Sequence, residues 1–405
     1  MPLDSPATPS QNTVDTLTGH NPMLYTPAFW AMALANLCHT ASFSAFFLLP
    51  LYILDHGGNQ GDIGVVMGVF ALASAVCRPW VAEMIDRIGR KRSYTLGSIL
   101  MVASPLLYIF IQDPLGSSYP FLLLIRVIHG VGLAICFTAV FTFMADILPQ
   151  DRLNEGIGMF GISGLIGIAL GPVLAEIILK DFGFFGLFLT AGGLAAVALL
   201  VHQPLQESYP ERSTKRQSTF FGLFKREKFI VVGLLSMLFG FGLAGTGGFV
   251  APLAEERNLG FISVYFFCYS GGAIAVRFVG GRLADSFSEN HILPYSIVLY
   301  MTGLFLLPFT YNQATLCAAG ILSGIGHGLL FPLLNTMAIR NEPAAIRGKV
   351  TGIFTGGIDT GIFAGSLMLG YIGDWFGLNV LFICAGLSMA SALVIFRFRS
   401  SRSTA

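Results

Sequence analysis

Four charged side chains lie deep inside long apolar stretches of the sequence, and their types are those that bind anions or carry protons. They are Arg78, Arg126, Arg277 and Asp359, and Glu176 lies nearer the end of its own stretch. An ionised side chain at the centre of a bilayer costs about 2.5–3.5 kcal/mol, so it usually faces the protein interior and has a partner. Three deep cations and one deep carboxylate leave positive charge unmatched. This favours an anionic solute; the alternative is that the cations donate hydrogen bonds to backbone carbonyls and neutral amides.

Asp359 is the residue best suited to carry a proton. It lies in the sequence GGIDTGIF, about ten residues, or ~15 Å of helix rise, from Lys349. Burial favours the neutral form of a carboxyl group, whereas a nearby arginine favours the charged form. A group under both influences can take up and release a proton; the alternative is a static ion pair between helices.

Five neutral polar side chains also fall within apolar stretches, where they could serve as ligands. They are Asn36, His39, His129, His327 and Asn335. The alternative for a lone histidine at such depth is an ordinary hydrogen bond in the protein interior.

The composition predicts that membrane-spanning helices position these residues. Of the 405 residues, 54% are hydrophobic and 11% are charged, and the mean hydropathy of +0.72 excludes a soluble chain. The apolar residues fall in blocks of about 20, the length that a helix needs to cross ~30 Å of hydrocarbon. We therefore expect an all-α membrane protein with twelve spans, at residues 27–54, 62–82, 93–111, 120–145, 156–179, 183–201, 229–252, 261–281, 292–311, 315–338, 350–372 and 378–396.

The same composition argues against other classes of protein. The six cysteines lie inside apolar stretches without paired spacing, so we expect no metal site, disulfide framework or cofactor. The sequence has no Gly-x-x-x-x-Gly-Lys motif and no clustered nucleophile and base, which argues against an ATP-driven pump and an enzyme. With a net charge of +1 and scattered basic residues, no nucleic-acid partner is expected.

Lysine and arginine predict the orientation, because they are retained on the cytoplasmic face. Most of the 23 fall in segments that are cytoplasmic if the N-terminus is inside the cell. This predicts a multi-pass protein of the bacterial cytoplasmic membrane. We also expect the protein to be a monomer. Its expected parts are a disordered cytoplasmic tail (1–26), a six-helix bundle (27–201), a cytoplasmic linker (202–228), a second six-helix bundle (229–396) and a tail (397–405).

The two predicted bundles repeat each other in sequence. Arg78 precedes Asp86 by eight residues, and Arg277 precedes Asp285 by eight, at an offset of 199. Further on, FGFFGLFLTAG from residue 182 matches FGLNVLFICAG from residue 376 at an offset of 194. A duplicated six-helix unit is typical of transporters, in which the substrate cavity lies at the interface of the repeats.

The segment AEMIDRIGRKR resembles the signature of the major facilitator superfamily. The matching residues are Asp86, Arg87, Gly89, Arg90 and Lys91, whereas Ala82 replaces the usual first glycine. Asp86 can accept backbone hydrogens at a neighbouring helix N-terminus, and the basic residues can pair with acidic groups of the other bundle. The resemblance implies a gate that holds the cytoplasmic side shut, with a weaker second copy at Gly281 and Asp285.

Two further segments extend the resemblance over nearly the whole chain. RVIHGVGLA holds Arg126 and resembles the motif whose intramembrane arginine is linked to proton transfer in proton-coupled members. GISGLIGIALGPVLAE holds Gly167, Gly171 and Pro172 and resembles the helix-packing motif of the drug/proton antiporter-like efflux permeases. The glycine pair that usually closes this motif is replaced, and the segment ends in Glu176.

The resemblance also implies a mechanism. Spans one, four, seven and ten line the cavity in this superfamily, and the five neutral polar side chains lie on three of these spans. Spans two and eleven are neighbours, so we expect Arg78 and Asp359 to form an ion pair that breaks when the cytoplasmic side opens. The expected function is secondary transport of a small organic solute by alternating access. Proton-coupled efflux is favoured; the alternatives are an importer of an organic acid or sugar, and a nontransporting sensor or lipid-acting enzyme.

Overall fold

The computed structural model describes residues 24–111, 115–149, 152–208, 222–223, 226–286, 289–340 and 342–403. Within these ranges the side chains of residues 154, 279–286, 289–290, 344–345, 347–348 and 400–403 are excepted. The described residues form helices and short turns, with no strand among them. Most of the predicted N-terminal tail and of the linker lies outside the described residues.

The predicted spans fall on helices, although the first span is divided between two α-helices and two pairs of spans each share one long helix. In chain order the helices are α1 (Pro27–Ala45), α2 (Leu49–Asp55), α3 (Gln60–Ile88), α4 (Arg90–Tyr108), α5 (Leu115–Ile147), α6 (Leu153–Val201), α7 (Glu227–Glu256), α8 (Ser263–Ser286), α9 (Glu289–Leu306), α10 (Gln313–Ile339) and α11 (Ala344–Ser403). Eight helical segments of the described chain are long and apolar enough to cross a membrane. The prediction of an all-α membrane fold is therefore confirmed.

Two of these segments are too long for a single crossing, and each is interrupted by a glycine. Gly183 in α6 has φ 62°, and Gly377 in α11 has φ 83°. Glycine adopts positive φ at little cost because it has no Cβ. Both residues are the second residue of the FG segments that repeat at the offset of 194, so the repeat places the same turn in both halves.

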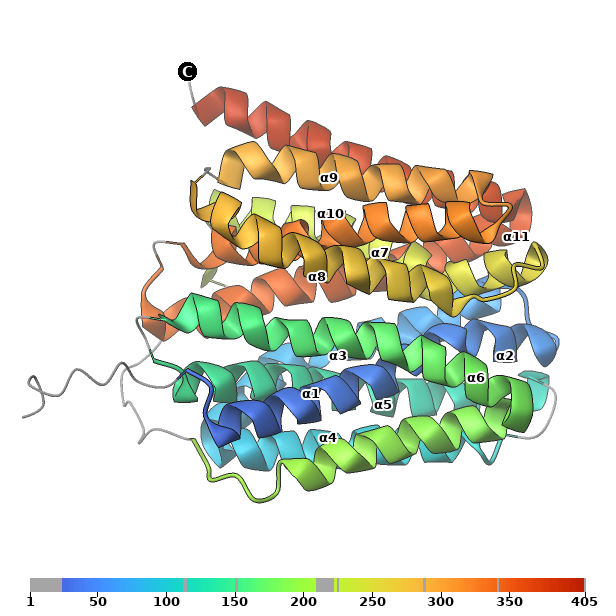
Figure 1. The fold of residues 1–405 in the computed structure, drawn as a ribbon, viewed down its shortest axis with the longest axis horizontal. Coiled ribbons are helices and arrows are strands. Elements are labelled where there is room, and N and C mark those ends of the chain that lie inside the picture. Colours follow the sequence, from blue (N-terminus) through green and yellow to red (C-terminus); the bar gives the residue numbers. More distant parts are fainter. Residues whose placement is uncertain are drawn as a thin grey trace, which may run out of the picture.

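Helices α1–α6, here called the N half, lie beside helices α7–α11, here called the C half (Figure 1). Within each half, glycines let two helices approach closely. A Cβ at Gly167 of α6 would lie 2.7 Å from the Leu37 carbonyl oxygen of α1, and a Cβ at Gly171 would lie 2.3 Å from the Ala41 oxygen. Close approach of this kind is how helices associate in lipid. The structure thus gives Gly167 and Gly171 the packing role that the sequence predicts.

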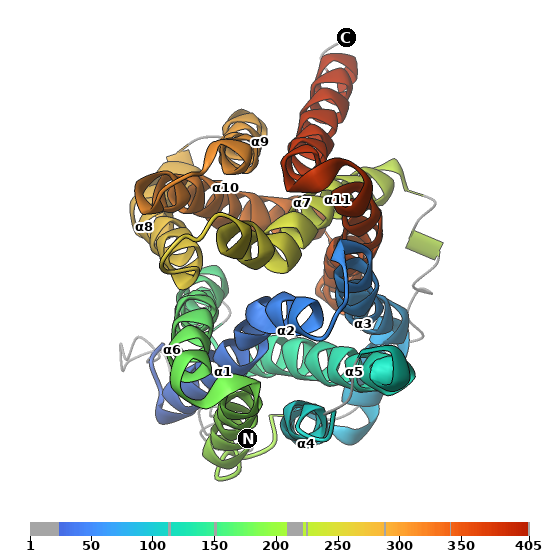
Figure 2. The ribbon, with the colours of Figure 1, turned by 90° about the vertical axis from the view of Figure 1, so that its right-hand side faces the viewer.

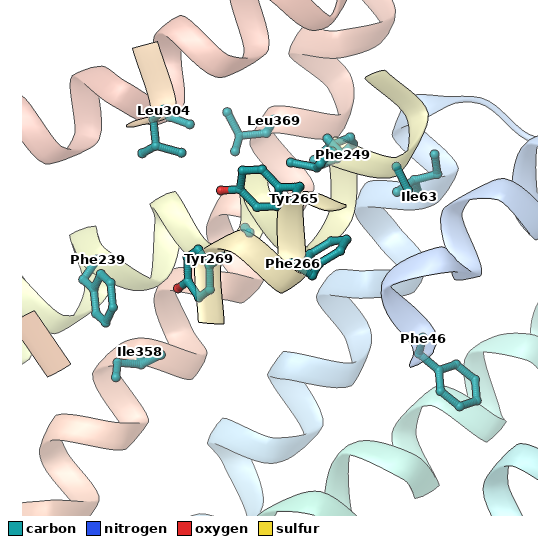
Figure 3. Close-up of a cluster of buried hydrophobic side chains, with 14 of the residues drawn as sticks. Phe46, Ile63, Phe239, Phe249, Tyr265, Phe266, Tyr269, Leu304, Ile358 and Leu369 are labelled. Carbon is teal, nitrogen blue, oxygen red and sulfur yellow. The ribbon is translucent and has the colours of Figure 1, made fainter. Parts of the chain in front are cut away.

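One large apolar cluster includes buried side chains of both halves. Figure 3 shows Phe46 and Ile63 of the N half and Phe249, Tyr265 and Phe266 of the C half in this cluster. Aromatic rings also stack directly across the two halves, where the ring centroids of Phe47 and Phe266 are 4.9 Å apart. The two halves therefore share a packed interior, in which the short 3-10 helix Phe46–Leu48 meets α8.

Candidate functional site

The two ends of the helix assembly differ in charge. The end at the left of Figure 1, here called the basic end, carries the turn between α3 and α4, the start of α7 and both described chain ends. The other end, here called the opposite end, carries the turns 56–59 and 257–262 and is viewed in Figure 2, where α2 lies near its centre beside α7.

The signature segment forms a sharp turn at the basic end. Gly89 has φ 101°, and this positive value explains why glycine separates α3 from α4. The carboxylate of Glu207 accepts hydrogen bonds from the backbone N–H groups of Arg90, Lys91 and Arg92, at 2.7, 3.0 and 3.3 Å. An anion is favourable at a helix N-terminus because four backbone donors there lack helical partners. The linker residue Glu207 was not predicted as part of this site.

Two basic residues of the signature, Arg87 and Arg90, form ion pairs within their own half. Arg90 is buried, and its guanidinium lies 2.9 Å from Asp146 of α5 and 3.4 Å from Asp86. Arg87 pairs with Glu83, one helical turn before it. In this conformation these ion pairs therefore join the start of α4 to α3 and α5 of the N half. The gating role of the segment stays a prediction, and the side chains of its second copy, Gly281 and Asp285, lie outside the described residues.

The expected pair between Arg78 and Asp359 is present, at the seam where α3 packs against α11. The Nε and Nη2 atoms of Arg78 both lie 2.6 Å from Oδ2 of Asp359. The hydroxyl of Ser74, one turn before Arg78, donates to the same oxygen at 2.8 Å. Both charged side chains are largely buried, with 11% and 14% of their surfaces exposed. A charge-assisted network of this kind is strong because little water competes with it.

Arg126 of α5 has partners of a different kind. It is 1% exposed, its Nε donates to the Val66 carbonyl oxygen of α3 at 3.0 Å, and its guanidinium carbon lies 4.3 Å from the centre of the Phe70 ring. A carbonyl oxygen and an aromatic face both stabilise a buried cation. Arg126 therefore joins α5 to α3 inside the N half, and its link to proton movement stays a prediction.

Arg277 of α8 has neither an ion pair nor a hydrogen bond among the described residues, and its buried Nε lacks a partner. Its Nη1 lies against Gly161 of α6, where a Cβ would be only 2.8 Å away. Gly161 belongs to the other half, so Arg277 reaches across the seam between α6 and α8.

The five neutral polar candidates do not form one cluster. Asn36 of α1 donates to Ser163 of α6 at 2.9 Å, a contact within the N half. His39 lies 2.7 Å from the hydroxyl of Tyr94 in the interior of the N half. The contact with Tyr94 supports the ordinary hydrogen-bonding alternative for His39, and both contacts lie within the N half.

The other candidates lie in α5 and α10. Both ring nitrogens of His129 are buried without a partner, between the rings of Phe46 and Phe70. His327 is hydrogen-bonded to the hydroxyl of Tyr269, and the side-chain oxygen of Asn335 is buried without a partner. The ring centroid of His327 lies 5.4 Å from that of Tyr269 and 5.3 Å from that of Phe239, two residues labelled in Figure 3. His327 and Tyr269 therefore join α10 to α8 within the C half.

At the opposite end, two carboxylates join the two halves. The sequence did not assign either of them to a gate. Asp374 of α11 accepts hydrogen bonds from the backbone N–H groups of Gln60 and Gly61, both at 2.8 Å, at the start of α3. Glu176 of α6 accepts from Ile262 and Ser263 at 2.9 and 2.8 Å, at the start of α8. Each half thus caps a helix N-terminus of the other half.

Glycine also permits close contact of α3 with α11 at this end. A Cβ at Gly64 would lie 2.4 Å from the Ser366 carbonyl oxygen, and a Cβ at Gly370 would lie 2.7 Å from the Gln60 oxygen. A larger residue at either position would push the helices apart. The structure therefore represents a conformation in which the two halves are closed together at the opposite end. The Arg78–Asp359 pair is formed in this conformation.

Comparison with known proteins agrees with this architecture. The chain is 24% identical over 375 residues to the quinolone resistance protein NorA of Staphylococcus aureus, with 86% of this chain and 90% of NorA aligned. It is also 24% identical over 344 residues to an uncharacterized MFS-type transporter of Methanocaldococcus jannaschii, covering 82% of this chain and 87% of that one. A solved POT family transporter has the same fold, with a TM-score of 0.75, 15% identity and 93% and 96% of the two chains covered.

The family model described as Major Facilitator Superfamily matches residues 31–294 and again 232–405. The two matches together span both halves, in keeping with the duplicated unit and the signature segment. This chain belongs to the Major Facilitator Superfamily.

Proposed function

We propose that this protein is a secondary active transporter that exports a small organic solute in exchange for protons. In this proposal the basic end faces the cytoplasm, and the solute site lies between the two halves. The relatives named as quinolone resistance proteins and as an MFS-type transporter support transport in general.

The main support for the proposal is the hydrogen-bonded network of Asp359, Arg78 and Ser74. It holds a carboxylate inside the apolar region, at a seam between the two halves. Protonation of Asp359 would remove its attraction for Arg78, and the uncompensated guanidinium would then favour a different arrangement of the two helices. A proton that binds there therefore changes the relative free energies of two conformations, which is what coupling requires.

Alternating access needs a second closed end, and the opposite end supplies the contacts for it. The caps formed by Asp374 and Glu176 join the halves in the present conformation. When these caps separate, the signature residues of the basic end are free to take up contacts between the halves. The two sets of contacts are then alternatives, one for each access state.

A growth assay separates export from import. The chain is expressed in a bacterial host that lacks its own drug exporters, and growth is measured across a panel of toxic compounds that includes quinolones and toxic analogues of organic acids and sugars. Export predicts that the host tolerates at least one compound better. An Asp359→Asn variant, checked for equal amounts in the membrane, should lose the protection. Greater sensitivity to a compound would instead show import, and no change across the panel would count against export of toxic solutes.

A further inference from the structure

The repeat places two arginines at matching positions, and the structure gives them different partners. Arg78 of α3 lies at the α3–α11 seam and binds Asp359 with two nitrogens. Arg277 of α8, at the offset of 199, lies at the α6–α8 seam. The residue of α6 that corresponds to Asp359 by the offset of 194 is Leu165, which is buried and apolar. One seam therefore contains a carboxylate for its arginine, whereas the other does not.

Arg277 lies at a depth where water is scarce. It precedes Asp285 by eight residues, or ~12 Å of helix rise, so it lies well inside the apolar part of α8. Its Nε is buried without a hydrogen-bond partner, and the structure pairs its guanidinium with no described carboxylate. Deep arginines that persist without a protein counter-ion usually face a binding site or a water-filled pathway.

The surroundings of Arg277 contain donors and space but no negative charge among the described residues. Arg277 lies close enough to Tyr269 and His327 to act on both electrostatically. Across the seam, α6 presents Gly161, whose missing side chain leaves room for the guanidinium. One turn further along α6, a Cβ at Gly164 would lie 3.4 Å from the amide nitrogen of Asn36. Positions three apart on a helix are neighbours, so Asn36 and Arg277 approach the same stretch of α6.

We propose that Arg277 binds a carboxylate group of the transported solute. The solute carboxylate would occupy, at the α6–α8 seam, the place that Asp359 occupies at the α3–α11 seam. A guanidinium presents two parallel N–H groups that match the two oxygens of a carboxylate, and this favours carboxylates among organic anions. The inference rests on the proposed function of solute transport and adds the chemical class of the solute.

The position of the site also connects binding with conformational change. Arg277 belongs to the C half, whereas Gly161 and Asn36 belong to the N half. A carboxylate held at this point would contact both halves, so its binding would depend on how the halves are arranged. A ligand shifts a conformational equilibrium only by its difference in affinity between the states. A site that spans the seam provides such a difference.

The test is direct binding to the purified full-length protein in lipid nanodiscs, without a proton gradient. The probes are 1-naphthoate and its neutral counterpart 1-naphthamide, which differ in the charge of one group. We expect naphthoate to bind at least tenfold more tightly than naphthamide. Arg277→Gln should remove this preference, and Arg277→Lys should retain part of it. Lys180→Gln, which removes an exposed cation of α6 close to the interruption at Gly183, should leave this preference unchanged.

A second pair of variants keeps the test decisive if Arg277→Gln folds poorly. Gly161→Asp would place a carboxylate beside Nη1 of Arg277, so it should abolish naphthoate binding while the unfolding temperature stays equal or rises. Gly161→Asn has nearly the same volume without the charge and should retain naphthoate binding within about threefold. Equal losses in both variants would show that space and not charge matters, and would overturn the proposal.

The outcomes separate this inference from the proposed function. Equal binding of naphthoate and naphthamide, or a charge preference that survives in Arg277→Gln, would overturn the carboxylate site even if the protein exports a neutral or cationic compound. A charge preference that depends on Arg277 would support the site even if transport proves to be inward or independent of protons.

Discussion

Replacing Asp374 and Glu176 by alanine should open the end of the molecule that these carboxylates hold closed. Each carboxylate accepts two backbone hydrogen bonds of 2.8–2.9 Å from the first turn of a helix in the other half. Loss of a capping side chain costs about 1 kcal/mol, within a range of roughly 0.5–2 kcal/mol. The closed arrangement should therefore lose a factor of about 5 in population for each substitution.

The two caps belong to different seams and share no described partner, so their effects should add. The double variant should then shift the equilibrium by about 2 kcal/mol, or roughly 30-fold, toward an open opposite end. Asp374→Asn is a useful intermediate, because its amide oxygen can still accept one hydrogen bond while the charge is lost. It should shift the equilibrium less than Asp374→Ala does.

The assay is a distance measurement by pulsed electron spin resonance. Spin labels are attached at Asp55 of the N half and Tyr311 of the C half, which are exposed at the opposite end, after the native cysteines have been replaced. The longer distances should gain population in the order wild type, single variants, double variant. Glu256→Ala removes another exposed carboxylate at the same end and should have no effect. An unchanged distance distribution in a correctly folded double variant would refute the capping argument.

Three further predictions concern the charged residues inside and at the edge of the membrane region. The first uses a double-mutant cycle on transport rate. Arg78→Gln and Asp359→Asn should each reduce the rate about tenfold or more, because each leaves a buried charged partner uncompensated. The double variant should recover part of the loss, and strictly additive effects would contradict this. Arg126→Lys should impair transport at equal expression, since a point charge cannot bond the Val66 oxygen and stack on an aromatic ring in the same way; normal coupled transport would show that the guanidinium is dispensable. Asp86→Asn should slow turnover and reduce crosslinking between the basic ends of the two halves, and unchanged crosslinking would remove Asp86 from the gate.

The helices and the repeat could be predicted because they depend on local apolarity and on duplicated sequence. The FG segments predicted equivalent positions in the two halves, and the structure shows the same positive-φ glycine in both. The pair of Arg78 and Asp359 followed from equal depth on neighbouring spans. Charge inside an apolar stretch is a strong signal because it is costly, and this is why the prediction of the pair succeeded.

The acceptors of backbone hydrogens could not be predicted from the sequence. Glu207, Asp374 and Glu176 all bind N–H groups at helix starts that are distant in the chain. Every residue type except proline supplies a backbone N–H, so the partner leaves no pattern in the sequence. The replacement of a motif glycine by Glu176 was visible as a departure from the family pattern, but its meaning required the position of α8.

The central claim is that this protein exports an organic solute in exchange for protons. The most direct test is solute uptake into everted membrane vesicles, whose outer surface corresponds to the cytoplasmic face. The substrate is the compound that gave the strongest protection in the growth assay, and an inside-acid gradient is imposed. Proton-coupled export predicts accumulation that a protonophore abolishes and that Asp359→Asn lacks. Accumulation that is indifferent to the gradient, or that occurs only in right-side-out vesicles, would contradict it.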